Sequence, residues 1–160
     1  MTDIFGGREV LELAIQAEEK GEHLYRTLAK KSKNFHVREV FKELAADEER
    51  HIMDLRKLED KFAPYEPVEA YPGEYLLYIK SMADESTFKC DKSCKTFLET
   101  DINEDDALQA GITFEKDFII FLHSLRNHVN KADTKIVDMI IFAEEGHLKK
   151  LYAQKKKINS

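Results

Sequence analysis

Several residue types that would direct this sequence toward other fold classes are scarce or missing. The 160 residues contain no tryptophan, three prolines and six glycines, so few helix breakers interrupt the long charged stretches and helices are favoured. Two cysteines are too few for a disulfide framework or a four-thiolate metal site. We interpret Cys90 and Cys94 as incidental thiols, with a redox pair or a metal contact as alternatives. No apolar run approaches the roughly 20 residues that span a bilayer.

The overall charge excludes two further classes of partner. A net charge of −6 argues against nucleic acid or an anionic membrane surface as the main partner. Residues 1–5 show neither a basic nor an apolar leader segment, so we expect no signal peptide and a cytoplasmic protein. The length predicts one domain over residues 1–160, large enough to bury a core.

Apolar residues recur at alternating steps of three and four in four long segments, which predicts four amphipathic helices. We place them at about residues 8–32, 35–62, 104–127 and 134–156, with a short connecting helix near 74–84. Asn34 and Asp133 are the expected N-caps of the second and fourth helices. Three prolines end the second helix, at positions 64, 67 and 72.

The lengths of the links between these helices predict their directions. Short links leave the first and second helices antiparallel, and likewise the third and fourth. The connection of some forty residues between the second and third can run the length of the bundle, so those two are expected to be parallel. The predicted fold is therefore an all-α four-helix bundle with one long crossover connection that carries a short extra helix.

Two Glu-x-x-His motifs interrupt the apolar stripes. Glu48 precedes His51 in the second helix, and Glu144 precedes His147 in the fourth. Glu18 lies 30 residues before Glu48, and Glu115 lies 29 residues before Glu144. These six side chains are the only carboxylates and imidazoles on the four stripes. Four carboxylates and two imidazoles facing inward are the ligand set of a dinuclear iron or manganese centre in a helix bundle.

A single Glu-x-x-His pair is more often a solvated surface feature, but four buried carboxylates are different. Each costs several kcal/mol to bury, and together they repel one another, so without compensation their pKa values rise until most are protonated. Two divalent cations balance four carboxylates, with the imidazoles as neutral ligands. This donor set suits iron or manganese, and zinc is a possible substitute by affinity order.

The motifs resemble the erythrin domain of the rubrerythrin family, within the ferritin-like superfamily. The resemblance covers nearly the whole chain and is carried by one segment in each predicted helix, at residues 17–25, 46–51, 114–121 and 142–147. It implies that Glu48 and Glu144 bridge two iron ions. Glu18 and Glu115 would be terminal carboxylates, His51 and His147 would each supply a nitrogen, and Tyr25 would lie beside the ligands.

The resemblance also implies an activity, which is the reduction of hydrogen peroxide by a di-iron site. The sequence departs from the family at two places: Phe118 stands where relatives carry an additional glutamate, and Leu122 where they carry a tyrosine. Because no rubredoxin module with cysteine pairs is found, electrons are expected from a separate protein such as a rubredoxin.

Three functions therefore stay open. The first is a non-haem di-iron peroxidase or oxidase that acts on peroxide or oxygen, and the six ligands would then be its catalytic residues. The second is a ferroxidase or iron-handling protein, and the third is a non-catalytic bundle that metal stabilises. Apolar residues 118–121 of the third helix belong either to the core or to a dimer face, and the apolar residues around so much of this helix favour a homodimer. Glu19 and Glu22 are alternatives to Glu18 as the ligand of the first helix, but they lie off its stripe. Glu49 and Glu145 flank the motifs and suit a solvated position or one beside the ligands. The other histidines lie off the stripes and are interpreted as surface or helix-end residues: His23, His36, His123 and His128.

Overall fold

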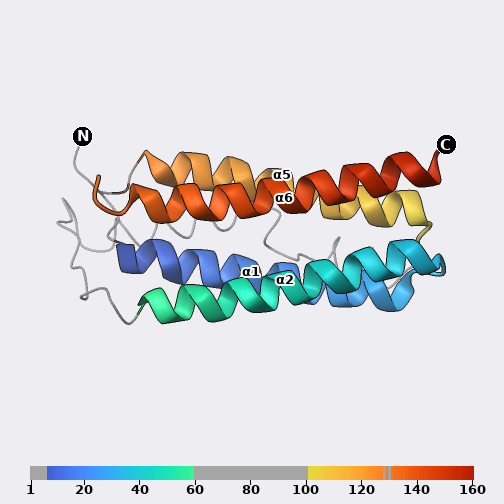
Figure 1. Ribbon diagram of the computed structural model, residues 1–160, viewed down its shortest axis with the longest axis horizontal. Coiled ribbons are helices and arrows are strands. Elements are labelled where there is room, and N and C mark those ends of the chain that lie inside the picture. The colour runs from blue at the N-terminus through green and yellow to red at the C-terminus, as the bar shows by residue number, and fades with distance from the viewer. Residues whose placement is uncertain (1–6, 60–100, 128, 130) are drawn as a thin grey trace.

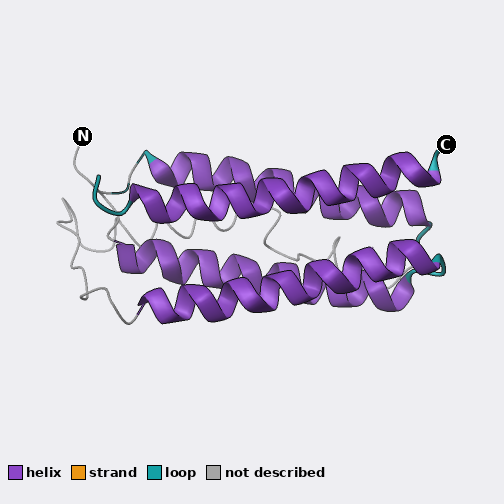
Figure 2. Ribbon diagram, viewed as in Figure 1, coloured by secondary structure: helices purple, strands orange, loops and turns teal. Residues whose placement is uncertain are grey.

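Four long helices pack as two hairpins laid side by side in the computed structural model (Figure 1). The structure describes residues 7–59, 101–127, 129 and 131–160. The helices are α1 (Gly7–Lys31), α2 (Phe35–Glu59), α5 (Glu104–Arg126) and α6 (Thr134–Ile158), and the regular elements drawn in Figure 2 are all helices. The predicted connecting helix and both cysteines lie outside the described residues. None of the described helices is long and apolar enough to cross a membrane.

The helix directions give the bundle its crossover. In Figure 1, α1 and α6 run one way along the bundle, and α2 and α5 run the other way. The end of α2 and the start of α5 therefore lie at opposite ends of the molecule. The four-helix fold is thus confirmed, including the parallel course of α2 and α5 that the long connection predicted.

Side chains at the helix starts explain where some of the helices begin. Asn34 caps α2, because its Oδ1 accepts hydrogen bonds from the backbone N–H groups of His36 at 2.9 Å and Val37 at 3.2 Å. Asn103 caps α5 in the same way, through Asp106 N at 2.8 Å. The expectation for α6 was wrong in one respect: Asp133 occupies the N-cap position but makes no side-chain capping hydrogen bond.

One carboxylate joins the two hairpins at the end of the bundle where α5 begins. Oε1 of Glu104 accepts hydrogen bonds from the backbone N–H groups of Lys33 at 2.6 Å and Asn34 at 2.7 Å. These N–H groups belong to the α1–α2 turn, while Glu104 is the first residue of α5. The contact therefore fixes the first hairpin against the start of the second.

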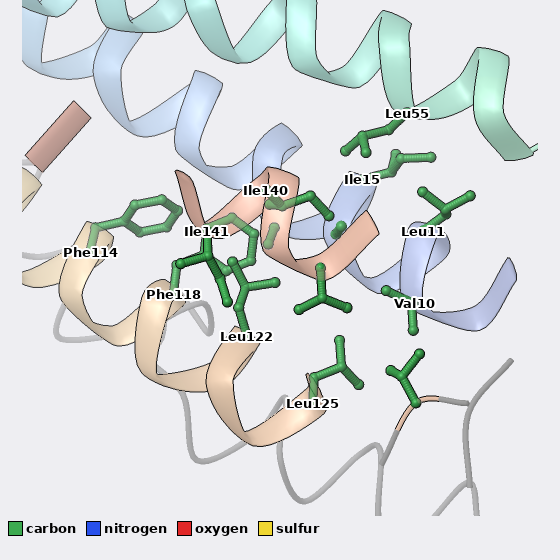
Figure 3. Close-up of a cluster of buried hydrophobic side chains, with 14 residues drawn as sticks. Val10, Leu11, Ile15, Leu55, Phe114, Phe118, Leu122, Leu125, Ile140 and Ile141 are labelled. Atoms are coloured by element: carbon green, nitrogen blue, oxygen red, sulfur yellow. The ribbon is translucent and has the colours of Figure 1, made fainter. Parts of the chain in front are cut away.

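The predicted stripes form the interior of the bundle. The regularly spaced apolar residues of α1, α5 and α6 are buried, among them Leu11 and Leu125 toward one end of the bundle and Leu108 and Leu151 toward the other. The apolar ones fall into two clusters. One surrounds Leu11, Phe118 and Leu122, with side chains from all four helices (Figure 3). The other contains Tyr25, Phe41, Leu44 and Leu151, and the acidic positions lie between the two.

Candidate metal centre

Each of the four helices contributes one buried glutamate at the level between the two apolar clusters. Glu18 comes from α1, Glu48 from α2, Glu115 from α5 and Glu144 from α6, and each side chain is almost fully buried. They point inward because each occupies a stripe position, where the helical repeat of 3.6 residues keeps the side chain on the core face. The two Glu-x-x-His motifs add His51 and His147 one turn further along α2 and α6.

The first donor set gathers around His51. Its Nδ1 atom lies 3.3 Å from Oε2 of Glu18, 3.6 Å from Oε2 of Glu48 and 3.7 Å from Oε1 of Glu144. We call these four side chains the His51 set. Three carboxylate oxygens from three different helices thus face one imidazole nitrogen.

The second donor set gathers around His147. Its Nδ1 atom lies 3.3 Å from Oε1 of Glu48, 3.5 Å from Oε1 of Glu115 and 3.2 Å from Oε2 of Glu144. We call these side chains the His147 set. The two imidazole rings are stacked at 5.1 Å between their centroids, so the two sets lie side by side across the bundle axis.

The two sets share Glu48 and Glu144 in a particular way. Each of these glutamates directs one oxygen at His51 and the other oxygen at His147. Glu18 belongs only to the His51 set and Glu115 only to the His147 set. With the two histidines, the shared glutamates form a cluster whose ligand atoms lie within 4.8 Å of one another. This is the arrangement that two cations need if they are to be joined by two carboxylates.

The hydrogen-bonding state of these atoms fits a pair of bound cations. Both oxygens of Glu48, both oxygens of Glu144, Oε2 of Glu115 and Nδ1 of His147 are buried without a hydrogen-bond partner of normal geometry. Buried polar atoms are otherwise nearly always paired, because an unpaired one costs about 1–3 kcal/mol. Six such atoms that converge on one place are donors that a bound metal would satisfy. The carboxylate and imidazole donors found among the described residues suit iron or manganese.

Burial and mutual repulsion raise the pKa of three of the four glutamates in the metal-free protein. Burial, followed by the neighbouring Glu48, raises the pKa of Glu18 to about 11. Burial and then the charge of Glu144 raise the pKa of Glu115 well above its usual value. Burial and then the charge of Glu48 raise the pKa of Glu144 to about 7. Burial and mutual repulsion therefore support the expectation that most of these carboxyls are protonated when no cation is bound.

Glu48 and His147 behave as an ion pair within this cluster. Burial by itself would raise the pKa of Glu48, but the nearby Glu18 carboxyl and the His147 and His51 rings lower it to about 2. Burial would likewise lower the pKa of His147, but Glu115, Glu144 and Glu48 raise it to about 12. The metal-free centre thus keeps its charge small through protons, and a cation that binds there has to displace them.

Tyr25 lies where the sequence predicted it, beside the ligand positions. Its hydroxyl donates a hydrogen bond to Oε1 of Glu115, and its ring stacks on Phe41 with 6.1 Å between the centroids. Phe118 and Leu122, which stand at the two departures from the family pattern, are both buried in the first apolar cluster. That side of the centre is therefore lined by hydrocarbon instead of a fifth carboxylate and a phenol.

Among the described residues, Asp47 also lies beside the donor sets, although the sequence pattern did not predict it. Its Oδ2 lies 3.8 Å from Nε2 of His147, on the opposite edge of the ring from the glutamates. Asp47 is in turn held by Lys150, whose Nζ lies 2.6 Å from Oδ2, and by Arg50. Its position directly before Glu48 in the sequence could have predicted this contact, because that position lies on the side of α2 that faces α6.

The alternative ligand candidates lie on the surface. Glu19 is exposed and pairs with Arg56 at 2.6 Å, and Glu22 pairs with Arg26. Three of the remaining histidines are exposed, namely His23, His36 and His123, whereas the side chain of His128 lies outside the described residues. The two glutamates that flank the motifs, Glu49 and Glu145, are also exposed.

Comparisons with known proteins agree with this centre. The family model described as rubrerythrin matches residues 9–155. A crystal structure from Thermotoga maritima, described as a ferritin-like diiron-carboxylate protein, is similar over 98% of this chain and 98% of its own chain. That similarity has 29% sequence identity and a TM-score of 0.64. A comparison with curated proteins gives no match.

Proposed function

This chain belongs to the rubrerythrin family, and we propose that its buried centre holds two iron ions and reduces hydrogen peroxide. The observation that supports this proposal is the sharing of Glu48 and Glu144, each with one oxygen toward His51 and the other toward His147. Glu18 and His51 would complete one metal position, and Glu115 and His147 the other. The description of the Thermotoga maritima relative as a diiron-carboxylate protein favours iron.

The chemistry of the bound group follows from its electron count. A pair of ferrous ions supplies the two electrons that cleavage of the O–O bond in hydrogen peroxide requires, and two protons complete the formation of two water molecules. Electrons would return from a separate donor protein such as a rubredoxin. Oxygen is the alternative oxidant for the same centre.

The protein's own contribution is to hold the donors and to keep most water away. The apolar clusters above and below the centre leave the carboxylates almost fully buried, which strengthens their interaction with cations. The Tyr25 hydroxyl donates a hydrogen bond to Oε1 of Glu115, so it fixes the orientation of that terminal carboxylate. Asp47 faces Nε2 of His147, which favours the proton on that nitrogen and leaves Nδ1 free as a ligand atom.

Rapid mixing under anaerobic conditions tests the peroxidase proposal. The protein is loaded with two equivalents of ferrous iron and mixed in parallel with hydrogen peroxide and with oxygenated buffer, while the ferric absorption is recorded. We expect peroxide to oxidise the centre faster than oxygen does. Glu115→Gln should slow this oxidation, whereas Glu19→Gln, at an exposed position one residue after Glu18, should not. Ferrous iron that persists in the presence of peroxide would sink the proposal.

Oxidation of ferrous iron as a substrate is the second candidate, and the partial exposure of His51 favours it. The side chain of His51 is 27% exposed, whereas the side chain of His147 is 4% exposed. Repeated additions of ferrous iron with oxygen would distinguish the two activities, because a ferroxidase turns over beyond two ions per chain.

We also propose a homodimer, supported by the exposed Ile120, Met139 and Phe142 on the outer side of α5 and α6. Light scattering in solution tests this proposal.

A further inference from the structure

The two halves of the bundle repeat the same ligands but differ in the residues around them. Because Glu48 and His51 correspond to Glu144 and His147, each residue near the motif of α2 has a counterpart 96 positions later in α6. The residue before Glu48 is Asp47, and the residue before Glu144 is Ala143. The internal repeat therefore breaks directly beside the ligands.

Around His147, one carboxylate held by two cations lies at the outer edge of the ring. Asp47 lies 3.8 Å from Nε2 of His147. Lys150 reaches across from α6 to Asp47 at 2.6 Å, and Arg50 binds the other oxygen of Asp47 from within α2. This network joins α2 to α6 and leaves the His147 side chain only 4% exposed.

The counterparts of these three residues cannot build the same network around His51. Ala143 stands in place of Asp47, and Gly146 stands in place of Arg50. A Cβ atom built at Gly146 meets nothing within 4 Å. Asp54 stands in place of Lys150, and it pairs along its own helix with Lys57 at 2.9 Å, in an exposed ion pair. The His51 side chain is correspondingly 27% exposed.

We propose that the two metal positions differ in exchange rate: the position lined by Glu18 and His51 exchanges its ion with solvent, and the position lined by Glu115 and His147 is closed. Ala143 and Gly146 keep the first position open because they lack the side chains that would cover His51. Asp47, with Lys150 and Arg50, keeps the second position closed and orients the His147 ring. This inference rests on the proposed two-metal centre.

The expected consequence concerns metal exchange and does not require turnover. Cobalt(II) is a suitable probe, because its visible absorption reports oxygen and nitrogen ligands and it takes similar donor sets. The full chain is loaded with two equivalents of cobalt(II) and mixed with excess chelator, and the absorption is followed over time. We expect two phases of equal amplitude, with the fast phase from the His51 position and the slow phase from the His147 position.

Substitutions on each side assign the phases. Ala143→Asp supplies the missing counterpart of Asp47, so it should slow the fast phase on the order of tenfold and leave the slow phase unchanged. Lys150→Ala, at a half-exposed position, removes the cation that holds Asp47 from α6 and should accelerate the slow phase on a similar scale. Lys149→Ala is the matched control, since Lys149 is exposed and, in the part of the chain that the structure describes, pairs with Glu145 at 3.8 Å in its own helix; it should change neither phase.

The outcomes separate this inference from the proposed function. If two cobalt ions bind but leave in a single phase, or if Ala143→Asp leaves the fast phase as it was, the inequivalence is refuted while the two-metal centre stands. If fewer than two ions bind per chain, the two-metal centre itself is refuted, and this inference with it. Far-UV circular dichroism of each variant confirms that the bundle is folded before the exchange rates are compared.

Discussion

The metal-free protein should become less stable as the pH rises from 6 to 8. Glu18 has a folded-state pKa of about 11 against an ordinary value of 4.5. Its contribution to stability is therefore complete below about pH 4.5 and is lost as the pH rises toward 11. Glu115, whose pKa is also raised, and His147, whose pKa is raised from 6.5 to about 12, act in the same direction. Glu48, with a pKa lowered to about 2, contributes no change in this window.

The size of the effect follows from the number of protons that the folded state binds in excess of the unfolded state. Each extra proton held by the folded state lowers the free energy of unfolding by about 1.4 kcal/mol per pH unit. Glu18 alone therefore accounts for about 3 kcal/mol between pH 6 and pH 8, and Glu115 adds to it. For a chain of this length, such a change lowers the Tm on the order of 5–10 °C.

Chemical and thermal unfolding of chelator-treated protein at pH 6, 7 and 8 measures this slope. Protein loaded with a divalent metal should show the opposite trend, because the ligands have to lose their protons before the metal binds. Glu18→Gln resembles the protonated carboxyl, so it should lower the slope by about 1.4 kcal/mol per pH unit. Glu19→Gln, exposed on the same helix, should keep the wild-type slope. A metal-free protein that is as stable at pH 8 as at pH 6 would refute the reasoning.

Other expected results concern packing, hydrogen bonding and proton release. Gly146→Ala should stabilise the protein by about 1 kcal/mol, because its Cβ meets nothing within 4 Å and alanine favours the helix. Gly21→Ala should have a free energy of unfolding at least about 1 kcal/mol lower than that of Gly146→Ala, because its Cβ would lie 3.0 Å from Phe114 Cε1. Denaturant titration compares the two variants. Tyr25→Phe should cost about 1–3 kcal/mol in the metal-free protein, since it removes the hydrogen bond to Glu115. Metal loading near pH 7 should release roughly three to four protons per chain into an indicator solution, one each from Glu18, Glu115 and His147 and part of one from Glu144; release of none would contradict the raised pKa values.

Local periodicity explains why most of the fold could be predicted. The stripe residues Leu11, Phe41, Leu122 and Leu151 are all buried, because the spacing of apolar side chains along a helix fixes which face meets the core. Helix ends were harder to predict. Asp133 was expected to cap α6 and makes no such bond, while Glu104, which accepts from the α1–α2 turn, gave no local signal. Contacts of that kind join segments about 70 residues apart, so a short sequence window does not contain them.

The sequence by itself determined the four helices, their directions and the six side chains that meet between the two apolar clusters. It did so because helical spacing places Glu18, Glu48, Glu115 and Glu144 on the inward faces whatever the fine packing of the helices. Only the tertiary structure decided which oxygen of each shared glutamate faces which imidazole, and that Asp47 approaches His147 from outside. It also decided that His51 stays partly exposed while His147 is closed. These features depend on how far apart the helices lie and how each is rotated about its axis, which periodicity along one helix does not specify.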